Sequence, residues 1–216
     1  MKLFRYENFI KESKEDIDSI CKKFGIRNYT INEDSTVDVD WDVNLYDKGL
    51  TKIPLKFGKV SGYFSCGDNQ LKSLEGSPLS VGGGFNCSHN QLKSLSGAPL
   101  SVGGYFSCSF NQLKSLEGIS GRISGGIYCH DNQLRDVKGV KDGWLGEFSV
   151  YGNPVHEIFN LFPKDKWDEV IEILNEYEVI RDDGNLVILQ RLEQVFLELG
   201  LEVPEIEEIE GYKIHF

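Results

Sequence analysis

One 21-residue phrase is repeated between residues 60 and 153, and this repeat restricts the chain to a stacked, repetitive fold. Complete copies start at Val60, Val81, Val102 and Ile123, and a fifth copy starts at Trp144. An asparagine recurs at the same spacing: Asn69, Asn90, Asn111, Asn132 and Asn153. Because one short repeat cannot bury its own apolar face, successive copies must stack and share a core.

Each copy contains the leucine-rich repeat pattern L-x-L-x-x-N-x-L, with Phe64 and Cys66 in leucine positions and Leu71 and Leu74 further along. The alternation at 64 and 66 predicts one short strand per repeat, so the strands form a parallel β-sheet. Backbone groups at the turn after each strand need partners, and the carboxamide of Asn69 has donors and an acceptor for them. We therefore expect a buried asparagine ladder.

The rest of each copy is too short for an outer helix, and its glycines and prolines indicate turns and extended or 3₁₀ segments. The fold class expected is an α/β repeat: a leucine-rich repeat solenoid with an N-terminal helical cap and a C-terminal α/β cap. We assign residues 1–35 to the first cap, residues 36–158 to about six repeats, and residues 159–216 to the acidic second cap.

Segments outside the repeats carry helical patterns. Residues 5–24 have apolar side chains at helical spacing and end at Gly25, which predicts an amphipathic helix. After Pro154, residues 164–180 predict a second helix, residues 185–199 predict an apolar stretch and a third helix that ends at Gly200, and residues 210–216 predict a last strand.

Residues 36–59 form a degenerate first repeat, in which Lys48 replaces the asparagine. Alternation of Val37, Val39 and Trp41 with three aspartates, at 38, 40 and 42, predicts one longer strand with an acidic face. The D-x-D-x-D spacing also begins a calcium loop, but the glycine and glutamate that complete such a loop are missing. We expect no metal site here.

The net charge of −11 lies entirely at the C-terminus. Residues 1–59 carry 11 basic and 11 acidic side chains, residues 60–153 carry 7 and 7, and residues 154–216 carry 5 and 16. Neutral repeats with no basic stripe argue against direct nucleic-acid binding. The acidic block favours solubility, but it also fits a surface for a basic partner or a mimic of a phosphate backbone.

Four cysteines form a second ladder: Cys66, Cys87, Cys108 and Cys129. Parallel strands place these thiols in a row, whereas zinc needs ligands that converge on one point, so we expect buried apolar fillers. Val150 occupies the same column, which agrees with this interpretation. We find no catalytic group and no cofactor motif, and expect a protein that is not an enzyme.

The exposed positions of the repeats vary, and variable exposed positions are where recognition is expected. The candidate partner-binding residues are Tyr63, His89, Tyr105, Phe110, Tyr128, His130, Asp131 and Tyr151. Tyrosines beside glycines also shield backbone, which is the alternative role of Tyr63 and Tyr105. Phe110 gives the sharper signal, because an exposed phenylalanine at the rim has little to do in the free protein.

The repeat GGYFSCSxNQLKSLEGxP, the preceding residues 36–64 and the following YGNPVHEIFNLFP resemble the short leucine-rich repeat proteins of tailed bacteriophages. The resemblance covers roughly residues 30–216, and implies a phage protein that acts in the bacterial host cytoplasm or in the virion. The repeats also resemble those of secreted bacterial ubiquitin ligases, but no catalytic cysteine domain follows them.

The function we expect is a non-enzymatic protein-binding module, a phage protein that binds and inhibits a host defence protein. The alternatives are an acidic nucleic-acid mimic and a virion or assembly component that forms oligomers through an uncovered edge. No stretch has the length of a membrane span and no signal-peptide core is present, so we expect no membrane partner and a cytoplasmic location.

Overall fold

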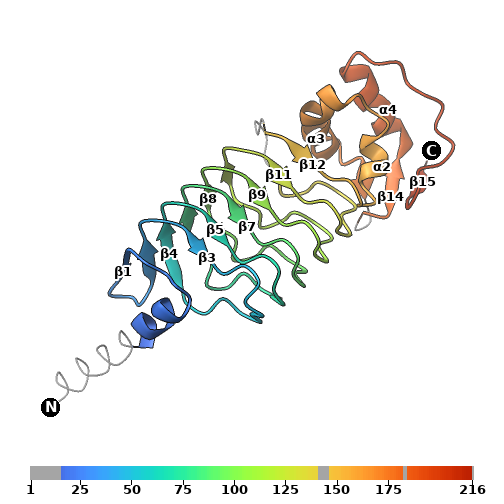
Figure 1. Ribbon diagram of the computed structural model, residues 1–216. Coiled ribbons are helices and arrows are strands. Elements are labelled where there is room, and N and C mark those ends of the chain that lie inside the picture. The colour runs from blue at the N-terminus through green and yellow to red at the C-terminus, as the bar shows by residue number, and fades with distance from the viewer. Residues whose placement is uncertain (1–15, 141–145, 182–183, 216) are drawn as a thin grey trace.

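The repeats form a parallel-strand β-solenoid, which runs from the N-terminal end to a separate helical and stranded segment at the other end (Figure 1). The computed structural model describes residues 16–140, 146–181 and 184–215. We call each 21-residue turn of the solenoid a rung. Successive rungs are in register, since Phe64 pairs with Phe85, which pairs with Phe106.

Each rung contributes two short strands to two separate sheets. Sheet A contains β1 (Tyr29–Ile31), β2 (Val37–Val39), β4 (Phe57–Val60), β6 (Ser80–Val81), β8 (Ser101–Val102) and β10 (Arg122–Ile123). Sheet B contains β3 (Val43–Asn44), β5 (Phe64–Ser65), β7 (Phe85–Asn86), β9 (Phe106–Ser107), β11 (Ile127–Tyr128) and β12 (Phe148–Ser149). All pairs are parallel except β1 with β2.

The prediction of one strand per repeat and a single sheet is therefore wrong. Sheet B is the predicted sheet, and sheet A arises in the segment where we expected turns and extended chain. Ser80 pairs with Lys59 and with Ser101 because the rungs are already aligned by sheet B and by the asparagine turns. Extended backbone at the same height in neighbouring rungs then pairs whatever its strand propensity.

The predicted asparagine ladder is confirmed. Asn90 is 9% exposed, and its Oδ1 accepts the Leu71 N–H at 2.8 Å. Its Nδ2 donates to the carbonyl oxygen of Cys66 at 3.0 Å and to that of Cys87 at 3.2 Å. Asn111, Asn132 and Asn153 make the same set of bonds, whereas Asn69, in the first full repeat, is half-buried.

The core between the two sheets is built from columns of identical side chains. The rings of Phe64, Phe85 and Phe106 are fully buried, with centroids 5.6 and 5.2 Å apart. At the corner from sheet A to sheet B the rungs approach very closely. A Cβ at Gly103 would lie 2.1 Å from the carbonyl oxygen of Gly82, so a side chain here requires the backbone to shift, although serine occupies the same column at Ser61 and Ser124.

The single acidic strand predicted for residues 37–43 is also wrong, because the chain turns the corner there and splits into β2 and β3. Two of the aspartates hold the next rung: Asp38 Oδ1 accepts the Lys59 N–H and Asp42 Oδ1 accepts the Tyr63 N–H, both at 2.7 Å. Trp41 lies at the corner with 67% of its surface exposed, not in the core that the alternation predicted.

At the N-terminal end, residues 16–23 are helical, and Cys21 and Ile26 bury their side chains against the first rungs. Residues 5–15 of the predicted helix lie outside the described residues, as does Trp144 at the start of the fifth copy.

The C-terminal segment contains the predicted helices and last strand. Its elements are α2 (His156–Phe159), the 3₁₀ helix η1 (Lys164–Lys166), α3 (Trp167–Glu176), β13 (Ile180–Arg181), β14 (Leu186–Ile188), α4 (Leu189–Glu198) and β15 (Lys213–His215). The strands form a third sheet in the order β13-β14-β15. Phe159 packs on Phe148 of the last rung, with ring centroids 5.6 Å apart, so that this segment contacts the end of the solenoid.

None of the helices in the described ranges has both the length and the apolar character that crossing a membrane requires.

Candidate functional site

A column of left-handed residues lies at the rim where sheet B ends. The residues are Asp47, Asp68, His89, Phe110, Asp131 and Gly152, with φ between 50° and 68°. Aspartate, histidine and glycine are the usual occupants of this conformation, but a bulky residue such as phenylalanine is strained in it by about 1–2 kcal/mol. Phe110 also leaves 42% of its surface exposed. Neither its backbone conformation nor its exposure helps the free protein to fold.

Four rings form a continuous ridge along this rim, which we call the rim ridge: His89, Phe110, His130 and Tyr151. The ring of His89 stacks on that of Phe110, with centroids 4.1 Å apart. The rings of Phe110 and His130 meet edge to face, with centroids 5.0 Å apart. His130 then stacks on Tyr151 at 4.3 Å. The Nδ1 of His130 lies 2.8 Å from Oδ2 of Asp131, which fixes the orientation of that ring.

A second aromatic line lies on the same face of sheet B, across from the rim ridge. It consists of Tyr63, Tyr105 and Tyr128, and we call it the tyrosine row. Their ring centroids are 5.9 Å apart in both steps. The ring of Tyr105 lies over Gly84, where a Cβ would come within 2.7 Å of it. The Tyr128 hydroxyl donates to Glu147 at 2.9 Å, and this bond to a carboxylate raises the pKa of Tyr128.

Small side chains fill the surface between the two aromatic lines. Ser65, Ser88 and Ser109 are 3%, 8% and 2% exposed. The Oγ of Ser88 lies 2.6 Å from the Oγ of Ser107. The Oγ of Ser109 is buried and has no hydrogen-bond partner among the groups that the structure describes. The result is a rigid face with a floor of small residues between aromatic borders.

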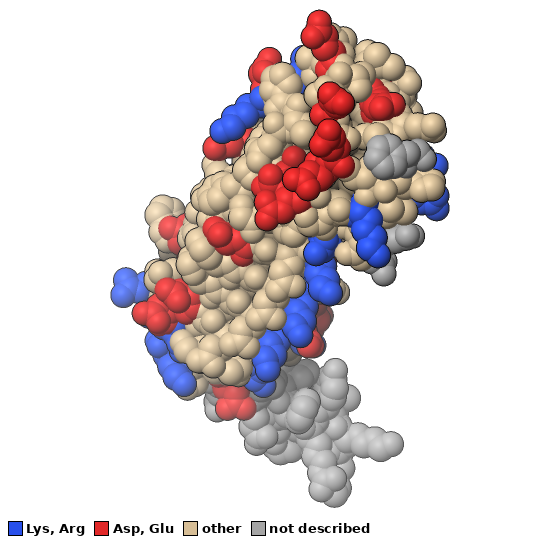
Figure 2. Space-filling model, turned by 90° about the vertical axis from the view of Figure 1, so that its right-hand side faces the viewer, with Lys and Arg blue, Asp and Glu red and all other residues tan. Residues whose placement is uncertain are grey.

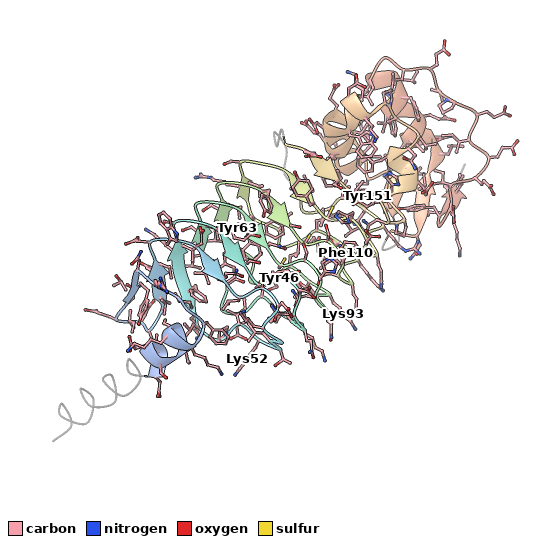
Figure 3. The ribbon with its side chains drawn as sticks, in the orientation of Figure 1. Tyr46, Lys52, Tyr63, Lys93, Phe110 and Tyr151 are labelled. Atoms are coloured by element: carbon pink, nitrogen blue, oxygen red, sulfur yellow. The ribbon has the colours of Figure 1, made fainter. Side chains whose placement is uncertain are left out.

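All eight residues that the sequence singled out lie on this face. Three form the tyrosine row, four form the rim ridge, and Asp131 holds His130. Figure 3 shows Tyr63, Phe110 and Tyr151 along the exposed side of sheet B, with Tyr46 on an earlier rung. Sequence reasoning missed Tyr46, which is 46% exposed and whose hydroxyl donates to Asp68 Oδ2 at 2.9 Å. Tyr46 lies one repeat before Gly67 and so belongs to the exposed column of His130 and Tyr151, which could have identified it. The ring of Tyr105 over Gly84 is also compatible with the alternative role of that tyrosine.

The cysteine ladder is buried, and none of its thiols forms a disulfide. Complete burial raises the pKa of the Cys66 and Cys108 thiols to about 12, so these groups stay protonated and unreactive at neutral pH. Within the ranges described above, no cluster of three or more His, Cys, Asp or Glu side chains is arranged to hold a metal ion.

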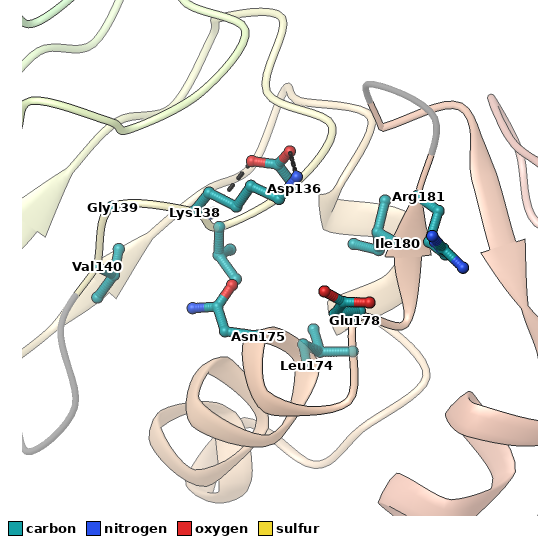
Figure 4. Close-up of a pocket in the computed structure, with 10 residues that line it drawn as sticks. Asp136, Lys138, Gly139, Val140, Leu174, Asn175, Glu178, Ile180 and Arg181 are labelled. Atoms are coloured by element: carbon teal, nitrogen blue, oxygen red, sulfur yellow. Dashed lines mark hydrogen bonds and ion pairs between the residues drawn. The ribbon is translucent and has the colours of Figure 1, made fainter.

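A cleft of about 550 Å³ separates the fourth repeat from the end of α3 (Figure 4). Three of its four charged groups have partners, since Lys138 lies 4.0 Å from Asp136 and Glu178 lies 3.6 Å from Arg191; the fourth is Arg181. A second cleft, of about 590 Å³, lies between strand β12 and Trp167. The first cleft is lined by no serine, cysteine or histidine. Ser149 and His156 both line the second, but His156 Nδ1 faces Asn160 Nδ2 at 3.5 Å, and no hydrogen bond joins the serine to the histidine in the described part of the chain.

Charge on the repeats is segregated, although it sums to zero. Lys72, Lys93 and Lys114 occupy one exposed column on consecutive rungs, so the prediction of repeats without a basic stripe is wrong. Figure 2 shows basic side chains in a row along one flank of the solenoid and acidic side chains over the C-terminal part.

Comparison of the chain with protein-family models, with curated proteins and with solved structures gives no match.

Proposed function

We propose that this protein is a non-enzymatic binding module that holds a protein partner on the outer face of sheet B. The observation that carries the proposal is Phe110, a large apolar side chain that is exposed and strained at the same position. Strain and exposure that do not help folding are expected at positions kept for binding. A partner that covers this ring would recover the apolar surface left open in the free protein.

The composition and rigidity of the face support a protein as the ligand. Tyrosine, histidine and serine dominate the face, and such residues make adaptable contacts while losing little side-chain entropy. The rings are held in place by one another and by the ladder beneath them, so little ordering remains to be done on binding.

We assign the solenoid to the leucine-rich repeat class, with the helix at residues 16–23 and the C-terminal segment as its two caps. The assignment is supported by the asparagine ladder and by the core columns at the leucine positions. Phe159 and Trp167, which cover the last rung, support the capping role.

The resemblance of the repeats and of their flanking segments to phage leucine-rich repeat proteins supports a phage origin. On that basis the partner we propose is a bacterial host protein in the cytoplasm, and the effect of binding is inhibition of a defence factor.

Affinity capture from bacterial lysate tests the proposal when it is done with a matched pair of variants. Phe110→Gly removes the ring from a left-handed position, and Asp47→Gly makes the same backbone change in the same column on the first rung. The wild type and Asp47→Gly should retain one stoichiometric partner, which Phe110→Gly should lose while it remains folded. Equal capture by the two variants would exclude the rim ridge as the binding site.

Nucleic-acid mimicry by the C-terminal block is the second candidate, and one observation favours it. Glu205, Glu207, Glu208 and Glu210 are all exposed on the segment before β15. Neutralising the four together should abolish binding to a basic nucleic-acid-binding protein if this block is the site. The capture experiment distinguishes the two candidates, because Phe110→Gly leaves the block unchanged.

A further inference from the structure

The lysine row consists of Lys72, Lys93 and Lys114, one from each of three consecutive rungs. Backbone bonds keep this part of each rung in register, since Gln91 N–H donates to Leu71 O and Gln112 N–H donates to Leu92 O, both at 2.9 Å. The row therefore repeats at the strand spacing of about 4.8 Å and spans roughly 10 Å. Figure 2 shows a line of basic side chains along one flank of the solenoid.

The three ammonium groups have no carboxylate within ion-pairing distance in the described part of the chain. The ion pairs there involve other lysines, such as Lys138 with Asp136 and Lys166 with Glu169. Arg135 occupies the same column on the next rung, but its guanidinium donates to the carbonyl oxygen of Gly211 at 2.6 Å. Like charges about 5 Å apart repel each other by about 1 kcal/mol in water before screening by salt. The row thus makes a small unfavourable contribution to the stability of the free protein, and no ion pair among the described residues offsets it.

The lysine row runs parallel to the rim ridge on the same flank of the solenoid. Between Phe110 and Lys114 the chain contains two buried residues, Asn111 and Leu113, and one exposed amide, Gln112. Figure 3 shows Lys93 close to Phe110 on this flank, with Lys52 on an earlier rung. A ligand that covers the ring of Phe110 therefore reaches the lysines across a single exposed column.

We propose that the lysine row binds an acidic segment of the protein partner that covers the rim ridge, and this inference rests on the proposed function. In an extended segment, side chains on one face recur every 6.6 Å or so. Lysine side chains are long and flexible enough to spread from the rung spacing to that distance. A stretch with carboxylates at alternate positions matches three lysines in number, charge and spacing.

A nucleic acid fits the row less well than an acidic peptide does. Three lysines are fewer than the six to ten phosphate contacts that are usual for strong nucleic-acid binding. The C-terminal part, with 5 basic and 16 acidic side chains, would repel a long polyanion that extended past the row. A short acidic segment ends before it reaches that part.

A labelled peptide of alternating Glu and Ser tests the row without any knowledge of the partner. We compare the wild type with the triple variant Lys72→Gln, Lys93→Gln and Lys114→Gln. The matched control is Lys23→Gln, Lys56→Gln and Lys59→Gln, which removes the same charge from other exposed lysines. Fluorescence anisotropy at an ionic strength of about 0.01 M should show binding about tenfold weaker in the row variant and unchanged in the control.

Three results would overturn the inference: no binding of the peptide by the wild type, equal loss in both variants, or tighter row-dependent binding of a single-stranded oligothymidine than of the peptide. Because this assay uses no cell extract, its failure leaves the capture result for Phe110→Gly untouched. Conversely, a failed capture experiment leaves the peptide result standing as a property of the row.

Discussion

The Nδ2 of Asn111 donates a hydrogen bond of 3.1 Å to the carbonyl oxygen of Cys87, a residue of the preceding rung. Its Oδ1 accepts the N–H of Leu92 at 2.9 Å. The Cys87 carbonyl oxygen also accepts a bond from Asn90 Nδ2, whereas Asn111 Oδ1 is the acceptor on which the Leu92 N–H depends. Asn111→Ala should lower the free energy of unfolding by about 1 to 3 kcal/mol, since the buried Leu92 N–H loses its acceptor.

Urea denaturation measures this loss, with Gln112→Ala as the control. Gln112 is exposed one position further along, so its replacement should change stability by less than about 0.5 kcal/mol. A cost for Asn111→Ala no larger than that of the control would show that water replaces the ladder.

Phe110→Gly should leave stability almost unchanged. Relief of about 1 kcal/mol or more of left-handed strain is offset by the lost stacking on His89 and by the extra entropy of glycine in the unfolded chain. Phe106→Ala, in the core of the same rung, should cost about 3 to 5 kcal/mol. Thermal denaturation of the two variants checks this contrast. A large destabilisation by Phe110→Gly would mean that the ring is structural.

Gly103→Ala should destabilise the solenoid by about 2 to 3 kcal/mol, because its Cβ would lie 2.1 Å from the Gly82 carbonyl oxygen and the backbone would have to shift. Gly200→Ala is the control: it introduces strain at a positive φ, but no atom lies within 4 Å of the new Cβ. Its cost should be about 1 kcal/mol. Equal costs in chemical denaturation would mean that the rungs separate at the corner without penalty.

The cysteine ladder should make the protein sensitive to alkali. The pKa of Cys66 and Cys108 rises from 9.0 to about 12 on folding, so between these pH values the unfolded chain releases protons that the folded chain keeps. Stability is therefore unaffected below pH 9.0, and above it falls by about 1.4 kcal/mol per pH unit for each thiol.

The double variant Cys66→Val and Cys108→Val should lose less stability between those pH values. Valine is already accepted in this column at Val150, which is fully buried. Denaturation curves at a series of pH values decide the matter, and parallel losses in the variant and the wild type would refute the assignment.

The part of the fold that was predictable from the sequence is the part that the 21-residue repeat determines. Asn69 and its successors predicted the ladder, and Phe64 and Cys66 predicted sheet B, because identical residues at one spacing must occupy equivalent places. Sheet A was not predictable, since Ser80 and Val81 lie between a proline and two glycines and become a strand only when neighbouring rungs align them. Trp41 was misplaced for a similar reason: the alternation continues through a corner where the chain changes direction.

The candidate surface was predictable residue by residue, but its connections were not. The rim ridge passes from Phe110 to His130, which belong to different columns of the repeat, so a column-by-column reading separates them. The lysine row was missed because net charge was summed over whole segments. The position of each charged residue within its rung, and not the net charge of the segment, decides where a charged surface forms.

In both solenoid sheets, the repeated strands from β5 and β6 onward align each residue with its equivalent one rung away, so the number of rungs can change without a change in the pairing. Excising residues 81–101 as a unit would join Ser80 to Val102 and leave every remaining column continuous. A gene of this kind can gain or lose whole repeats by recombination between its own copies, and each event would alter the exposed side chains without rebuilding the interior.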